Sequence, residues 1–261
     1  MKYINMLILV SLFATSRSIA QSLTITGPDT QMLEQGQTYA ITWSGDSVKT
    51  VTIIAYGIRT PEGQMSRGKF IINISSGTSA DAGSVNWKVP WIDSRTFLIK
   101  IKGYNASGNP VVSAEHGYEF HPAILSKRKL DGIYLDLHQK IDQRLYVQKD
   151  QRIIHIYLVS SSENYLWEPP NIHPAIPHDH AGIFKVLRKE PDHWSNLAHV
   201  HMLYALQYLN GHYIHATSAN LYHLLGRPAS HGCNRLTRYD SKELYEITPV
   251  GTRVEVIGPK G

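Results

Sequence analysis

The chain has 261 residues, of which 42% are hydrophobic and 18% charged, with a formal net charge of +5 at pH 7. This length allows one or two domains with a sizeable core, and the composition is typical of a soluble globular protein. The mild positive charge would suit an anionic polymer as a partner, and an ordinary solvated surface is an equally good interpretation. There is no dense Lys/Arg stripe and no zinc-knuckle spacing, so we expect no nucleic-acid partner.

Residues 1–20 have the pattern of a secretory signal peptide. Lys2 supplies the positive start, an apolar run follows, and Ser18-Ile19-Ala20 has the small residues of a cleavage site. The apolar run is shorter than the about 20 residues that span a bilayer. We therefore expect a secreted protein of the periplasm or cell wall, with no transmembrane helix in the mature chain. An uncleaved N-terminal anchor is the alternative.

Residues 22–122 show the alternation of polar and apolar side chains that is typical of β-strands. Gly, Pro, Asn and Ser clusters separate the segments, which are 38–43, 51–56, 70–74, 84–89 and 98–102. Short strands at this spacing predict a β-sandwich. Trp43 and Trp87 stand in alternating strands, so we expect them in the core rather than on a sugar-binding surface.

Residues 123–130 are the predicted linker, because Pro122 ends the last strand and 126–129 reads as a solvated charge run. The second domain is predicted at 131–259. Its expected strands are 132–137, 144–147, 153–159 and 252–257, with a short helix after a cap at Asp240. A stretch with four prolines, 163–180, is interpreted as a loop over a cleft, and an ordered surface loop without contact to a substrate is the alternative. The sequence thus predicts a mainly β protein with short helices.

Cys233 is the only cysteine, and in an exported protein a lone cysteine suggests a free reactive thiol. A thiol attacks as its thiolate, so it needs a base or a positive field nearby. His215, 18 residues upstream, can supply the base, and Arg235 can supply permanent charge. Gly232 permits a sharp turn whose amides could form an oxyanion hole. We therefore expect Cys233 to be partly ionised. The alternative is a small buried cysteine and a core histidine.

Six further histidines in the second domain raise the question of a zinc site: His173, His178, His180, His193, His199 and His201. On a strand, His199 and His201 would share one face. The sequence has no HExxH motif and no third ligand at regular spacing. We expect no metal and no cofactor.

The stretch Ser230-His231-Gly232-Cys233-Asn234-Arg235, with His215 before it, resembles the catalytic motif of the L,D-transpeptidases of the YkuD type. The resemblance implies that Cys233 is the nucleophile and His215 the proton donor and acceptor. Arg235, Gly232 and Ala216 would assist, the Ala216 carbonyl by orienting His215. Ser230, His231 and Asn234 would lie on the substrate side, with His231 and Ser230 also shaping the turn.

Two other family motifs are incomplete in this chain. The family's Ser-Thr-Gly becomes Ser160-Ser161-Ser162, and of Thr-Pro-x-Gly-x-Phe only Gly182 and Phe184 survive. The implied activity is that of an exported peptidoglycan L,D-transpeptidase, which forms a thioester with a tetrapeptide stem and transfers it to an amine or water. The alternatives are a sortase-like enzyme, an L,D-carboxypeptidase and a non-catalytic wall-binding protein.

The N-terminal segment has its own resemblance, carried by Ile25-x-Gly-Pro28, Gly36-x-x-Tyr39-x-Ile41-x-Trp43-Ser44 and Gly83-x-x-x-Trp87-x-Val89-Pro90. These residues resemble the Ser-Thr-rich, Kre9/Knh1-like wall-protein domain. The resemblance implies a cell-wall polymer as a partner, in addition to the peptidoglycan stem peptides.

Overall fold

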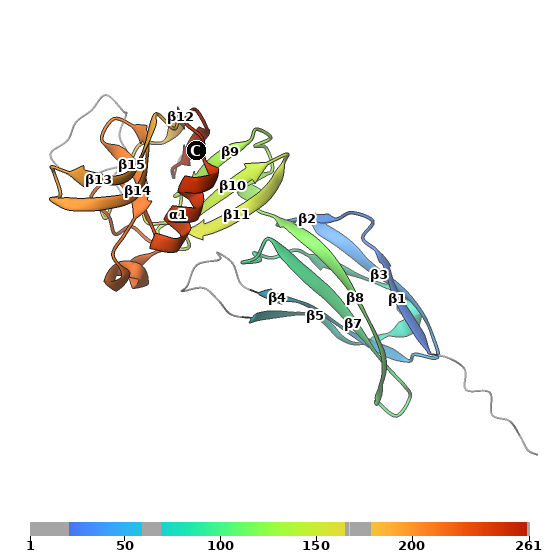
Figure 1. Cartoon of the computed structure of the whole chain (residues 1–261). Coiled ribbons are helices and arrows are strands. Elements are labelled where there is room, and N and C mark those ends of the chain that lie inside the picture. The colour runs from blue at the N-terminus through green and yellow to red at the C-terminus, as the bar shows by residue number, and fades with distance from the viewer. Residues whose placement is uncertain (1–20, 59–68, 165–166, 168–178, 260–261) are drawn as a thin grey trace, which may run out of the picture.

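The structure is a computed structural model that describes residues 21–58, 69–164, 167 and 179–259. The predicted signal peptide at 1–20 and most of the proline-rich loop, including 168–178, lie outside the described residues. The described part is mainly β, which confirms the predicted fold class. Its strands form four sheets in two parts that lie end to end, with β9, β10 and β11 nearest to the N-terminal part (Figure 1).

The N-terminal part is a β-sandwich. Its three-stranded sheet has the order β1-β3-β6, and its five-stranded sheet has the order β2-β8-β7-β4-β5. Neighbouring strands pair antiparallel except β2 and β8, which are parallel. The strands are β1 (Ser22–Gly27), β2 (Met32–Glu34), β3 (Thr38–Asp46), β4 (Thr50–Ile58), β5 (Lys69–Ser79), β6 (Ser84–Lys88), β7 (Thr96–Tyr104) and β8 (Pro110–His121).

The two tryptophans of the alternating strands belong to the sandwich core, as expected. Trp43 is 5% exposed and Trp87 is 7% exposed. The Trp43 indole donates a hydrogen bond to the Ala80 carbonyl at 3.0 Å, and the Trp87 ring meets Phe97 edge-on at 6.2 Å between centroids. The Trp43 N–H thus has a hydrogen-bond partner inside the core, and the Trp87 ring has a favourable aromatic contact there.

The C-terminal part packs a five-stranded sheet, β11-β10-β9-β17-β12, against a four-stranded sheet, β13-β14-β15-β16. A cluster of buried side chains fills the space between them, among them Leu135, Leu206, Leu236 and Val256. The elements are β9 (Gly132–Asp136), β10 (Arg144–Lys149), β11 (Arg152–Leu158), β12 (Gly182–Lys185), β13 (Arg188–Ser195), β14 (Val200–Leu209), β15 (His212–Ala216), β16 (Asn234–Leu236), α1 (Arg238–Ile247) and β17 (Arg253–Ile257).

The helix α1 begins two residues before the predicted cap. Thr237 is the cap, because its hydroxyl accepts a hydrogen bond from the Asp240 amide at 3.0 Å. Asp240 lies in the first turn, where a negative charge interacts favourably with the positive end of the helix dipole. The helix packs on β14 and β15. No helix in the described part of the chain has the length and apolar character needed to cross a membrane.

The predicted linker is a packed connector. Leu125 is completely buried, and Arg128 donates to Glu255 of β17 and to the Ile124 carbonyl, both at 2.6 Å. Lys127 and Lys129 are exposed, so the prediction of a solvated charge run holds for them and is wrong for Arg128. The error arose because Glu255, its partner, is 127 residues away in the chain.

The sandwich and the C-terminal part also touch directly. Arg152 makes two hydrogen bonds to the Glu119 carboxylate, at 2.6 and 3.0 Å. The Arg95 guanidinium donates to the Ile154 carbonyl at 2.6 Å. Trp91 packs against the hydrophobic clusters of both parts. These contacts bring side chains of both parts to a common interface.

Candidate active site

The strands β15 and β16 bring His215 and Cys233 together. They pair in parallel with His215 opposite Arg235, and Cys233 directly precedes β16. A pocket of about 750 Å³ is lined by both side chains together with His231, Gly232 and Arg235. Five of the eight predicted site residues therefore meet at one cavity, although they come from two segments of the chain.

His215 is held in one orientation by the backbone. Its Nδ1 lies 2.8 Å from the Ala216 carbonyl oxygen, the contact that the sequence predicts for Ala216. Because a carbonyl can only accept, Nδ1 carries the ring proton and Nε2 is left as a proton acceptor. Burial lowers the pKa of His215 to about 4, and the Arg235 charge acts in the same direction. The imidazole is therefore neutral at pH 7 and suited to act as a base.

The surroundings of Cys233 favour the protonated thiol. Burial raises its pKa to about 11, although the Tyr213 amide and the Arg235 charge both favour the thiolate. This direction runs against the expectation of a partly ionised cysteine, because the effect of desolvation on the pKa exceeds that of the nearby positive charge. With His215 also neutral, the proton must leave the sulfur during attack rather than before it.

This charge state predicts how Cys233 reacts with a small alkylating reagent. We expect the rate of iodoacetamide addition to rise about tenfold per pH unit from pH 7 to 10, because only the thiolate reacts and its fraction grows tenfold per unit below the pKa. Intact-protein mass at timed points would measure it. A rate that stays level between pH 6 and 8 would indicate a preformed thiolate–imidazolium pair and contradict the neutral state.

The turn before the nucleophile is built by Ser230, Gly232 and Arg235. Gly232 has φ of 116°, a region that favours glycine, and its amide donates to the Ser230 hydroxyl at 3.2 Å. The Arg235 guanidinium donates to the Ala229 carbonyl at 2.9 Å, so it braces the turn from the other side. His231 is exposed at the pocket. Ser230 and Asn234 are fully buried and do not line the pocket.

The segment Ser160-Ser161-Ser162 holds this turn through backbone hydrogen bonds. The Ser161 carbonyl accepts from the amides of Ala229 and Ser230, at 3.0 and 2.9 Å. The Gln143 side chain makes two hydrogen bonds to Ser161, both at 2.9 Å: its oxygen accepts from the Ser161 amide, and its nitrogen donates to the Ser161 hydroxyl. Sequence reasoning missed Gln143, because a single glutamine in a loop carries no pattern. The backbone of Ser160 pairs with Arg235 in both directions.

A buried carboxyl, Asp179, lies behind the nucleophile and was also missed. It is 1% exposed and accepts from the Ser162 amide at 2.9 Å. The Tyr208 hydroxyl donates to the Asn234 side chain at 2.9 Å, and Asn234 in turn interacts with Asp179. Burial raises the pKa of Asp179 to about 7, against the opposing effect of Ser162 and Asn234. The incomplete motif before Gly182 was the available signal, since Asp179 and His180 stand where the family has Thr-Pro.

The raised pKa of Asp179 predicts a pH-dependent stability. Below pH 3.8 the carboxyl is protonated in both folded and unfolded chains. As the pH rises toward 7 the unfolded chain releases its proton first, so stability falls across this window. We expect Asp179→Asn, which keeps the shape and an acceptor, to be more stable than the wild type at pH 8 by up to about 4 kcal/mol. Near pH 4 the two should be alike.

Denaturant unfolding at pH 4, 6 and 8 would measure this difference. Asp81→Asn is the matched control, because Asp81 is exposed on the sandwich and should show no pH-dependent gain. If Asp179→Asn were less stable at pH 8 than at pH 4 relative to the wild type, the ionised carboxylate would be stabilising and the sign would be wrong.

The hairpin of β13 and β14 forms another wall of the pocket. Trp194, Leu197 and Val200 are exposed at its tip, and Arg188 donates to the Tyr213 hydroxyl at 2.8 Å. His193 and His201 pair with carboxylates of their own hairpin, Glu190 and Asp192, both at 2.8 Å.

The remaining histidines have different surroundings. His199 precedes β14 with φ of 50°, so it is in a turn rather than on the strand with His201. His180 is buried, with its ring 4.7 Å from that of His212, and does not line the pocket. His173 and His178 lie outside the described residues. Within the described ranges, no three His, Cys, Asp or Glu side chains form a metal-binding group.

Comparison with known proteins identifies this part of the chain. Residues 133–256 match the family model of YkuD, the L,D-transpeptidase catalytic domain. The protein therefore carries a YkuD-family L,D-transpeptidase catalytic domain, and the family consists of cysteine-dependent acyltransferases. No curated protein matches the chain. The N-terminal resemblance to the Ser-Thr-rich wall-protein domain stays a prediction.

Solved structures of L,D-transpeptidases are similar to the chain. The protein from Stackebrandtia nassauensis is 27% identical over 51% of this chain and 60% of its own, with a TM-score of 0.40. That from Xylanimonas cellulosilytica is 26% identical over 50% and 62%, also with a TM-score of 0.40. That from Mycobacterium smegmatis is 14% identical over 91% and 100%, with a TM-score of 0.38. The chain thus spans about three fifths of the first two proteins.

Proposed function

We propose that the protein is an exported peptidoglycan L,D-transpeptidase with Cys233 as nucleophile and His215 as base. The observation that carries this proposal is the shared pocket, in which the thiol stands with a buried imidazole whose Nδ1 is fixed by Ala216. A core cysteine and a core histidine would have no reason to line one open cavity in this orientation. The signal-like segment 1–20 supports export to the periplasm or cell wall, where the family usually acts.

The first half of the reaction forms a thioester. The Cys233 sulfur attacks the carbonyl carbon after the third residue of a tetrapeptide stem, while its proton moves to Nε2 of His215. The bond to the terminal D-alanine then breaks, and His215 returns the proton to the leaving amine. The Cys233 amide is the backbone donor that we propose for the oxyanion, because the Gly232 amide already donates to the Ser230 hydroxyl.

The second half resolves the thioester. The amine of a neighbouring stem, or water, attacks the same carbonyl carbon and loses a proton to His215. The carbon–sulfur bond breaks, and the sulfur takes the proton back from His215. Because neither group begins as an ion, the pair is restored to its neutral state after each cycle.

The charge of the pocket supports an anionic peptide as substrate. Arg188 and Arg235 line it, and none of the described lining residues is Asp or Glu. Arg188 is partly neutralised by Glu190, at 2.8 Å, which itself does not line the cavity. A stem peptide carries free carboxylates, and guanidinium groups bind carboxylates with favourable geometry.

The proposal is tested by incubating the mature protein with tetrapeptide stems and reading the products by mass. Loss of D-alanine with joining of two stems supports transfer. Loss of D-alanine with addition of water alone indicates an L,D-carboxypeptidase. No acyl-enzyme and no product from a folded protein would favour the non-catalytic wall-binding alternative.

A carbapenem provides a second test of the thioester chemistry. Its strained carbonyl should acylate Cys233, so we expect intact-protein mass to increase by one drug mass, with no adduct in Cys233→Ala. The adduct should form much more slowly in His215→Ala, because the base must take the thiol proton. If iodoacetamide alkylates Cys233 and the drug does not, access to the pocket rather than the thiol would be limiting.

We propose two domains, 22–122 and 131–259, joined by the connector 123–130. Separate hydrophobic clusters on either side of the connector support this division. The resemblance of the sandwich to a wall-protein domain supports a role in positioning the catalytic domain on a cell-wall polymer.

A further inference from the structure

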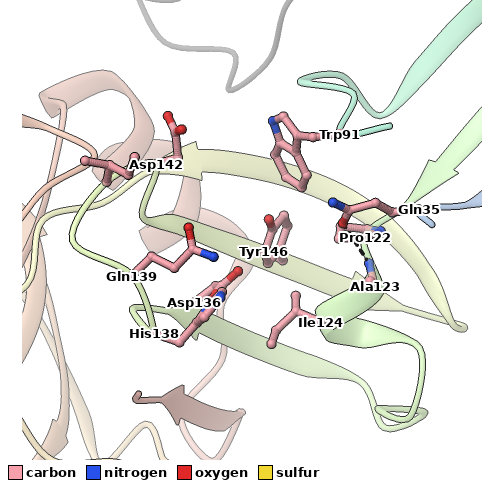
Figure 2. A pocket seen from close by; sticks show the side chains of 11 residues that line it. Gln35, Trp91, Pro122, Ala123, Ile124, Asp136, His138, Gln139, Asp142 and Tyr146 are labelled. Carbon is pink, nitrogen blue, oxygen red and sulfur yellow. Dashed lines mark hydrogen bonds and ion pairs between the residues drawn. The ribbon is translucent and has the colours of Figure 1, made fainter. Parts of the chain in front are cut away.

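A second pocket, of about 510 Å³, lies where the sandwich meets the catalytic domain. Gln35 and Trp91 reach it from the sandwich, Ile124 from the connector, and Asp136, Gln139 and Tyr146 from the catalytic domain (Figure 2). Its volume falls within the about 300–1,000 Å³ of small-molecule sites. It shares no lining residue with the pocket of Cys233.

The Tyr146 hydroxyl is the first sign that this pocket receives a ligand. Tyr146 is completely buried on β10, and its hydroxyl has no hydrogen-bond partner among the described residues. A buried hydroxyl without a hydrogen-bond partner destabilises a protein, so native structures rarely leave one. Figure 2 shows this hydroxyl between Trp91 and Asp136, within the lining of the pocket.

The other polar groups define the charge of the site. The Asp136 carboxyl is mostly buried and bonds to His138, and Asp142 and Gln139 also line the pocket. The Arg144 guanidinium is buried between Asp93 and Asp142, at 3.7 and 3.5 Å, and Arg128 pairs with Glu255. Two carboxylates without a free guanidinium repel phosphate or carboxylate ligands. They can accept hydrogen bonds from neutral hydroxyl groups.

The apolar part of the lining completes the match to a sugar. Trp91 is partly exposed and meets Tyr146 edge-on at 6.5 Å between centroids, and Ile124 lies across from it. A pyranose ring has C–H faces that pack on such surfaces and hydroxyls that both donate and accept. Carboxylate, carboxamide and phenol groups match these hydroxyls.

We propose that this interdomain pocket binds a neutral saccharide of one or two pyranose rings. The bound sugar contacts both domains, so it holds the catalytic domain at a set orientation relative to the saccharide chain. The proposal does not depend on acyl transfer, because the two pockets share no residues and binding can be measured without turnover.

Calorimetry with the mature full-length chain tests the proposal, using N-acetylglucosamine trimer, cellotriose and inorganic phosphate as probes. We expect at least one trisaccharide to bind and phosphate not to bind. Binding of the N-acetylated trimer alone would show that the acetamido group is recognised, and binding of both that it is not. Absence of binding by both trimers, or displacement of a trimer by phosphate, would overturn the proposal.

Tyr146→Phe is the decisive variant, because it removes only the unpartnered hydroxyl. We expect it to weaken trisaccharide binding about tenfold, while the melting temperature of the free protein stays level or rises. Tyr134→Phe is the matched control. The Tyr134 hydroxyl already donates to the Leu130 carbonyl at 2.6 Å, so its loss should lower stability and leave binding unchanged.

Gln139→Ala gives a second variant at an exposed position, with no buried packing to lose. It should weaken binding about fivefold, whereas Gln31→Ala on the sandwich surface should not. Unchanged affinity in both Tyr146→Phe and Gln139→Ala would place any bound sugar elsewhere and overturn the assignment.

Discussion

Replacing Cys233 by alanine should abolish both the acyl-enzyme and the transfer products, the largest effect expected of any single change. No other thiol exists in the chain, so no residue can substitute for the nucleophile. The fold should persist, because the side chain is only partly buried against the small cluster of Met202, Ala205 and Tyr213. Product mass spectrometry measures the loss, and a melting curve confirms that the variant is folded.

Cys233→Ser sharpens the same test. A serine hydroxyl keeps the size and a proton for His215, but it is a much weaker nucleophile without a stronger base. We expect no turnover and no carbapenem adduct from this variant. Normal product formation by Cys233→Ala would end the covalent mechanism, whatever the behaviour of Cys233→Ser.

His215→Ala should lower kcat/KM by about 10²–10⁴, the usual contribution of a general base. The effect should be large because Cys233 begins as a neutral thiol and needs an acceptor for its proton during attack. His231→Ala is the matched control, since His231 lines the same pocket but stands 3.8 Å from Glu163 instead of being held by a backbone carbonyl. We expect that control to change the rate only a few-fold.

The pH profile separates a base from a structural histidine. Burial places the pKa of His215 near 4, so its protonation should reduce the wild-type rate only below about pH 5. In His215→Ala that acid limb should disappear. If His231→Ala caused the greater loss, or carried the acid limb with it, the roles of the two histidines would be reversed.

Much of the fold could be predicted because its signals are local. Side chains alternate along a strand whatever its partners are, so the segments 38–43 and 98–102 correctly predicted β3 and β7. The same alternation correctly placed Trp43 and Trp87 in the core. The candidate site could also be predicted, because Ser230 to Arg235 is one continuous segment and His215 precedes it at a fixed spacing. The helix cap was predicted three residues too late, because Thr237 and Asp240 are both good caps and only the backbone distinguishes them.

By itself, the sequence determined the β architecture, the single thiol and the histidine that could serve it. The tertiary structure decided the charge of that thiol, since desolvation sums contributions from many distant segments and here exceeds the effect of Arg235. It also decided the burial of Asp179 behind the turn and the meeting of Trp91 with Tyr146 between the domains. Such contacts join residues far apart in the chain, and neither spacing nor alternation encodes which of them will share a low-dielectric interior.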